Sequence, residues 1–131
     1  MILHFKIAGG LLILVSLIHL TFPKNFSWVD DLRSLSLINR EMMKIHTFFI
    51  ALTVFLMGLL CIFESKDLIE TSLGKSVCLG LGIFWVIRLI IQFFGYSSEH
   101  WRGKKFETFM HIVFSFVWTY FSVLFLIAYF N

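Results

Sequence analysis

Four long apolar runs divide this sequence, and they constrain the fold more than any other feature. They predict helices over about 5–22, 42–63, 76–94 and 107–130. The apolar part of each run has about 18–22 residues, which is enough for a helix to cross a hydrocarbon layer roughly 30 Å thick. Alternating segments of about ten residues, which a β-barrel requires, do not occur. We therefore predict an all-α integral membrane protein, a four-helix bundle.

The composition indicates that little of the chain lies outside the bilayer. Hydrophobic residues make up 59% of the sequence, against roughly 45–50% in an average soluble domain. The first apolar run has a weakly charged start and no small-x-small cleavage site, so we predict a retained helix rather than a signal peptide. No internal repeat or low-complexity segment interrupts the chain, and we expect a single transmembrane domain over 1–131.

The connection between the first two runs contains a second helical pattern. Ser27 followed by Asp30 resembles a capping box with Asp in place of Glu. Trp28, Leu32 and Leu35 then share one helical face. This pattern is typical of a short helix that lies in the headgroup layer, and we predict one here. The connection over 64–75 reads instead as a short polar turn.

Basic residues are distributed unevenly between the two ends of the predicted helices. Seven lie in the connections 24–44 and 96–105, against three at the other end. Cytoplasmic loops carry the excess of Lys and Arg. We therefore expect both termini in the periplasm of a bacterial inner membrane. The two groups are Lys24, Arg33, Arg40, Lys44, Arg102, Lys104 and Lys105, and Lys6, Lys66 and Lys75.

Five polar side chains inside the spans fall in the same leaflet. His19 comes late in the first span, His46 early in the second, Arg88 and Gln92 late in the third, and His111 early in the fourth. Hydrocarbon cannot satisfy an imidazole or a guanidinium, so these groups are expected to face the interior. The alternative for Arg88 is a side chain that reaches back to the headgroups.

Each span has one polar stripe at helical spacing, which we expect to turn inward. Hydroxyls and single histidines on such stripes also serve as plain packing residues, and that alternative stays open. The stripes of the four spans are Gly9, Ser16 and His19; Asn39, Met43, His46, Thr53, Met57 and Cys61; Cys78, Trp85, Arg88 and Gln92; and Thr108, His111, Ser115, Trp118 and Ser122.

The sequence lacks the motifs that are typical of several function classes. The chain has no CxxC, HExxH, P-loop or GxSxG sequence, so membrane thiol oxidoreductases, zinc proteases, P-loop proteins and serine hydrolases are not indicated. The net charge of +3 suits an anionic membrane surface and gives no sign of nucleic-acid binding. Cys61 and Cys78 flank one short turn, so a disulfide stays open if that side is oxidising.

Three function classes remain. The first is a cofactor site, either a single b-type haem held by two of the histidines or a transition metal held by His19, His46 and His111. The second is a pocket for a polar small molecule, such as a quinone or a lipid headgroup, with hydrogen bonds from Arg88, Gln92 and the histidines. The third is a non-catalytic accessory or assembly subunit, packed on another membrane protein or on a second copy, whose polar stripe only specifies packing. No residue is assigned a catalytic role.

Two stretches carry a resemblance, "WVDDLRSLSLINREMMKIHTFF" and "FWVIRLIIQFF". They look like a group of small four-span bacterial membrane proteins of uncharacterised function. The likeness covers the first three spans and is carried by Trp28, Arg40, His46, Arg88 and Gln92. It implies a shared bundle and shared polar positions, and it implies no activity.

Overall fold

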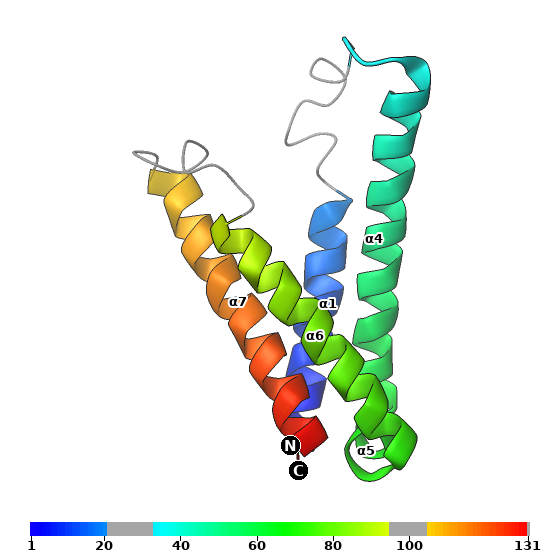
Figure 1. Ribbon diagram of the computed structural model, residues 1–131, viewed down its shortest axis with the longest axis vertical. Helices are drawn as coiled ribbons and strands as arrows, with labels where there is room; N and C mark the ends of the chain where they lie inside the picture. The colour runs from blue at the N-terminus through cyan, green and yellow to red at the C-terminus, as the bar shows by residue number, and fades with distance from the viewer. Residues whose placement is uncertain (21–32, 95–104, 131) are drawn as a thin grey trace. The chain divides into compact units, whose positions relative to one another are not determined.

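The computed structural model of this chain describes residues 1–20, 33–94 and 105–130. These residues form five helices and no strand: α1 (Ile2–His19), α4 (Leu37–Phe63), α5 (Ser65–Glu70), α6 (Ser72–Phe94) and α7 (Lys105–Phe130) (Figure 1). The predicted all-α class is confirmed. Four of the helices are long and apolar enough to cross a membrane, as a four-helix membrane bundle requires.

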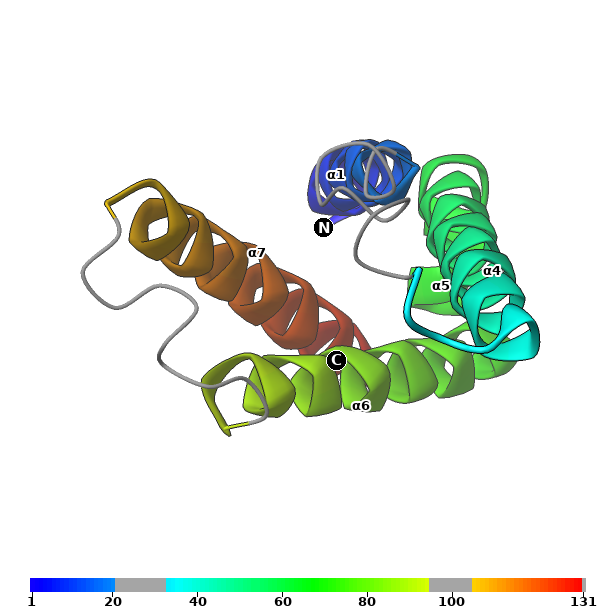
Figure 2. The same ribbon diagram turned by 90° about the horizontal axis from the view of Figure 1, so that it is seen from above.

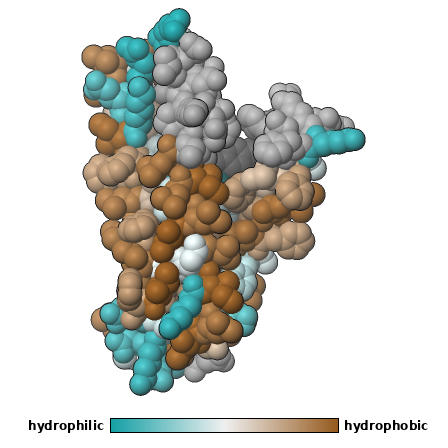
Figure 3. All heavy atoms as spheres, turned by 180° about the vertical axis from the view of Figure 1, so that it is seen from behind, coloured by the Kyte–Doolittle hydropathy of each residue, from teal (hydrophilic) through white to brown (hydrophobic). Residues whose placement is uncertain are grey.

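The helices associate as two antiparallel pairs, α1 with α4 and α6 with α7 (Figures 1 and 2). Ile2–Ser65 forms one compact unit, and Lys66–Asn131 belongs to a second. On the face that Figure 3 draws, apolar side chains cover most of the middle and polar ones gather towards the two ends. This distribution is the one that a bilayer selects. The prediction of one domain over the whole chain stays a prediction.

Helix α4 begins five residues earlier than predicted, at Leu37. Ser36 caps it, because its Oγ accepts a hydrogen bond from the backbone N–H of Asn39 at 3.4 Å. At 27 residues, α4 is about 40 Å long and exceeds the hydrocarbon thickness. Most of the predicted interfacial helix lies outside the described residues, and Leu35, the last residue of its predicted face, is not helical.

The predicted polar turn over 64–75 contains a short helix, α5, so the prediction of a plain turn is wrong. Thr71 organises the junction with α6: its Oγ1 donates to the carbonyl oxygen of Asp67 at 2.6 Å and accepts from the N–H of Gly74 at 2.9 Å. A Cβ on Gly74 would collide with the Asp67 carbonyl, so only glycine fits. Cys78 then donates its S–H to the carbonyl of Leu68 at 3.5 Å. Cys61 and Cys78 do not form a disulfide with each other.

The α1–α4 pair packs through small residues. A Cβ on Gly9 would lie 2.7 Å from the carbonyl oxygen of Gly58, and a Cβ on Gly58 would lie 2.8 Å from that of Gly9. Because neither glycine has a side chain, the two helix backbones approach each other closely. This is a usual packing mode of membrane helices. The buried residues around this crossing are Phe5, Ala8, Leu12, Val15, Ser16, Ala51, Val54 and Cys61.

The polar stripe predicted for the second span does not form this interface. Cys61 is buried as expected, but Asn39, His46 and Thr53 are exposed. Thr53 needs no partner on another helix, because its hydroxyl donates to the carbonyl oxygen of Phe49 at 2.8 Å. Glycine and alanine, rather than this stripe, therefore form the face of α4 that packs on α1, and an inward stripe in the complete bundle stays a prediction.

Candidate functional site

Gln92 is the centre of a hydrogen-bonded cluster between α6 and α7. Its Oε1 accepts from Nη1 of Arg88 at 3.3 Å and from the indole N–H of Trp118 at 3.4 Å. Its Nε2 lies 2.9 Å from Nδ1 of His111. The side chain is 8% exposed, and each end of its amide is bonded. The guanidinium of Arg88 therefore has a specific partner within the helix pair. An interior that Arg88 shares with all three histidines stays a prediction.

The two donors on Oε1 fix the orientation of the Gln92 amide. Arginine and the tryptophan indole can only donate. A flipped amide would turn its NH₂ group towards the N–H groups of both Arg88 and Trp118. The carbonyl oxygen must therefore face these two residues, and the NH₂ group must face His111.

The orientation of this amide in turn selects the tautomer of His111. A donor from Gln92 reaches Nδ1, so Nδ1 must be an unprotonated acceptor, and the neutral ring carries its proton on Nε2. The position of this proton is deduced from the heavy-atom network. A histidine in this state is a hydrogen-bond donor through Nε2 and does not offer that nitrogen as a metal ligand.

Aromatic rings hold the cluster on its other side. The Trp118 ring stacks on Trp85, with centroids 5.0 Å apart and planes 18° apart, and on Phe114 at 5.5 Å and 16°. The Cζ atom of Arg88 lies 5.3 Å from the Trp118 ring centroid, within cation–π range. Both tryptophans are buried, at 2% and 4% exposure. The indole N–H of Trp85 has no hydrogen-bond partner among the described residues, so stacking rather than hydrogen bonding fixes this ring.

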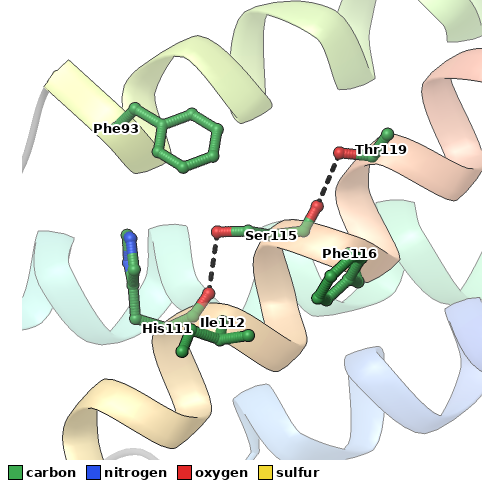
Figure 4. A pocket seen from close by; sticks show the side chains of 6 residues that line it. All are labelled: Phe93, His111, Ile112, Ser115, Phe116 and Thr119. Carbon is green, nitrogen blue, oxygen red and sulfur yellow. Dashed lines mark hydrogen bonds between the residues drawn. The ribbon is translucent and has the colours of Figure 1, made fainter.

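A pocket of about 270 Å³ adjoins His111 (Figure 4). Its walls come from both helices of the pair. The imidazole of His111 lies edge-on to the ring of Phe93, with centroids 5.8 Å apart. The six lining residues are Phe93, His111, Ile112, Ser115, Phe116 and Thr119, so a few polar atoms sit in an otherwise apolar wall, as in sites for small molecules.

The two remaining histidines of the predicted site belong to the α1–α4 pair. Nδ1 of His19 lies 2.9 Å from the carbonyl oxygen of Val15, which can only accept, so the His19 proton is on Nδ1. His46 lies on α4 and is exposed. Among the residues that the structure describes, no three His, Cys, Asp or Glu side chains are grouped so as to hold a metal ion. A metal at His19, His46 and His111 stays a prediction.

Sequence reasoning placed the polar residues of α6 and α7 on the correct faces but missed the pocket. Phe93, Ile112 and Phe116 were not singled out, because nothing in an apolar run distinguishes a pocket wall from a lipid-facing side chain. Trp118 belongs to the predicted inward stripe of its span but is not among the predicted site residues. Its spacing from His111, seven residues or two turns, is the signal that places the two side chains on one face.

Comparisons with protein-family models, with curated proteins and with solved structures find no match to this chain. The likeness to small four-span bacterial proteins therefore stays a prediction. Function has to be inferred from the geometry of the α6–α7 cluster.

Proposed function

We propose that this chain is a small multi-pass protein of a bacterial inner membrane that binds a lipid-soluble molecule through a polar headgroup at the α6–α7 pocket. The molecule is a quinone or a lipid with a polar headgroup. One observation carries the proposal: His111, whose Nδ1 lies 2.9 Å from Nε2 of the Gln92 amide, lines a mostly apolar pocket. A polar ring in apolar surroundings favours a ligand with a polar headgroup and an apolar body.

Each polar residue of the cluster has a distinct role in this proposal. His111 contacts the ligand, Gln92 sets the tautomer of His111, and Arg88 and Trp118 hold the amide of Gln92. The same arrangement counts against haem or metal ligation by His111. A coordinated Nε2 would need the proton on Nδ1, where it would meet the NH₂ group of Gln92.

A titration in mild detergent tests this function. A benzoquinone with a short alkyl chain, and in parallel a short-chain phosphatidic acid, are added while the tryptophan fluorescence is followed, because Trp85 and Trp118 lie beside the site. We expect a saturable change with at least one of them. Gln92→Glu should weaken it about tenfold, since a carboxylate keeps the bonds to Arg88 and Trp118 but makes Nδ1 of His111 the donor and removes the N–H from Nε2.

The control is Thr53→Val on α4, which lies on the other helix pair and should leave the titration unchanged. A response that fails to saturate with both compounds, or that Gln92→Glu leaves intact, would contradict the proposed function. An absorption spectrum of the same preparation with a Soret band that disappears in His111→Phe would support the haem class instead.

A second candidate is the accessory or assembly subunit, in which the cluster only specifies packing. The observation in its favour is that both ends of the Gln92 amide are bonded inside the α6–α7 pair. This candidate predicts that Gln92→Leu destabilises the protein while neither compound gives a saturable titration. The titration above therefore separates the two candidates.

The orientation that we propose has both termini in the periplasm, from the excess of basic residues in the connections 24–44 and 96–105. Single cysteines, Ser72→Cys and Ser98→Cys, can be introduced into a chain that lacks its two native cysteines. An impermeant maleimide added to whole cells should label position 72 and not 98. The reverse labelling would overturn this orientation.

A further inference from the structure

The face of α4 that packs on α1 continues past the end of α1. Gly9 and Gly58 mark the crossing of the two helices, and from there α4 runs about 11 residues further than α1, or roughly 16 Å. Figure 1 shows α4 continuing beyond the last turn of α1. The spacing of the packed residues, carried towards the start of α4, leads to Thr47, Lys44 and Arg40. The packed residues are Ala51, Val54, Gly58 and Cys61.

Arg40 has an incompletely bonded side chain on this continuation. In residues 37–50 only Arg40 and Thr47 are half-buried, and the others before Ala51 are exposed. Nε of Arg40 is buried and has no hydrogen-bond partner among the described residues. A buried donor without an acceptor costs free energy. A conformation of this side chain that meets an anionic acceptor is therefore more stable than one without a partner.

The described part of the α1–α4 pair has no carboxylate in position to be that acceptor. Glu41 is the only acidic residue in 1–20 and 33–63. Neighbouring residues on a helix do not face each other, so Glu41 does not face Arg40. Lys44, four residues further along, instead brings a second cation to the same side of the helix. The pair therefore favours an anion that comes from outside these helices.

The position of Arg40 along α4 matches the headgroup layer of a bilayer. About 20 residues of helix cross a hydrocarbon layer of roughly 30 Å, so a span counted back from Phe63 reaches Lys44. Arg40 lies about 6 Å further out. The headgroup region adds roughly 5–8 Å on each side of the hydrocarbon. The anion that this layer supplies to Arg40 is the phosphate of a phospholipid.

We infer that Arg40 and Lys44 form a binding site for the phosphate of an anionic phospholipid. The guanidinium presents Nε and Nη donors to two phosphate oxygens, and Lys44 adds a point charge. Met43 and Phe48 are 43% and 52% exposed and lie one turn nearer the hydrocarbon, where they offer the acyl chains an apolar surface. A free phosphate ion gains nothing from that surface, and a zwitterionic headgroup brings an ammonium beside two cations. This site is on the α1–α4 pair and does not depend on the proposed function.

Native mass spectrometry of the full-length protein in mild detergent tests this site. Phosphatidylglycerol and phosphatidylcholine with the same acyl chains are titrated, and the dissociation constant of the first bound lipid is measured. We expect phosphatidylglycerol to bind about twentyfold more tightly, because each basic residue at a membrane surface is worth about fivefold. Arg40→Gln should reduce this preference to about fourfold. Arg40→Lys should leave less than about tenfold, since lysine keeps the charge but lacks the planar fork.

The matched control is Lys66→Gln in α5, which removes the same charge beyond the opposite end of α4. The preference should stay at about twentyfold, and so it should in Gln92→Glu. Equal effects of Arg40→Gln and Lys66→Gln would show attraction to the overall charge and would overturn the site. A preference that Gln92→Glu abolishes and Arg40→Gln preserves would place the lipid at the α6–α7 pocket, which overturns this inference and supports the proposed function.

Two further measurements identify the anion. Inorganic phosphate in large excess should not displace phosphatidylglycerol, and displacement would mean a site for a free ion rather than a lipid. Asp30 and Asp31, which lie outside the described residues, are the alternative partners of the guanidinium. If one of them bonded Arg40, Arg40→Gln would lower the unfolding midpoint equally in both lipids and leave the preference unchanged, and the lipid site would be wrong.

Discussion

Replacing Gln92 by leucine is expected to lower the free energy of unfolding by about 2 kcal/mol. The substitution removes three hydrogen bonds, each worth roughly 0.6 kcal/mol between membrane helices. It also leaves the indole N–H of the buried Trp118 without its acceptor. The midpoint of thermal unfolding in mild detergent measures this loss.

The matched control for this substitution is Ser122→Ala in the same helix pair. Ser122 is also buried, at 4% exposure, but its hydroxyl donates to the carbonyl oxygen of Trp118 on its own helix at 2.8 Å. Its removal leaves no side-chain donor without an acceptor. We therefore expect the free energy of unfolding to fall by less than about 0.5 kcal/mol. Equal unfolding midpoints for the two variants would mean that Gln92 is not the centre of a bonded cluster.

Replacing Gly9 by leucine is expected to lower the free energy of unfolding by about 3 kcal/mol, because the larger side chain forces α1 and α4 apart. A Cβ at this position would lie 2.5 Å from Cγ1 of Ile62, 2.7 Å from the carbonyl oxygen of Gly58 and 3.3 Å from Cβ of Cys61. The Ile62 side chain can move, but the backbone oxygen can do so only if the helix moves. The measurement is again the unfolding midpoint in detergent.

The adjacent residue provides the control. Gly10 lies on the same turn of α1, is exposed, and would place a Cβ in open space. The free energy of unfolding of Gly10→Leu should therefore lie within about 0.5 kcal/mol of that of the native chain, in line with other surface substitutions. If leucine were tolerated equally at both positions, the close crossing of α1 and α4 would be incorrect.

The faces of α6 and α7 could be predicted from the sequence because they carry polar side chains. Arg88 and Gln92 on one helix and His111 on the other have few ways to be satisfied in hydrocarbon, so their spacing identifies the packed face. The same logic does not identify the face of α4 that packs on α1. Thr53 satisfies its hydroxyl with its own backbone, and the packed face is built around Gly58, whose lack of a side chain gives no polar signal.

The pocket and its hydrogen-bonding character could not be predicted in the same way. The tautomer of His111 depends on two donors, Arg88 and Trp118, that meet one oxygen of Gln92. The sequence places these side chains on facing stripes but does not specify which atoms meet. The hydroxyl groups of Ser115 and Thr119 donate to backbone carbonyl oxygens of their own helix. These bonds depend on side-chain rotamers, which the spacing of the residues does not determine.

Nitrogen NMR of the histidine rings tests the central claim most directly, because protonated and unprotonated ring nitrogens have well-separated shifts. The signals of His111 are assigned by their loss in His111→Phe, in protein labelled at histidine and held in detergent at neutral pH. The native chain should show a protonated Nε2 and an unprotonated Nδ1, and Gln92→Glu should move the proton to Nδ1. A native His111 with its proton on Nδ1 would contradict the Gln92 network, and with it the donor on which the proposed site depends.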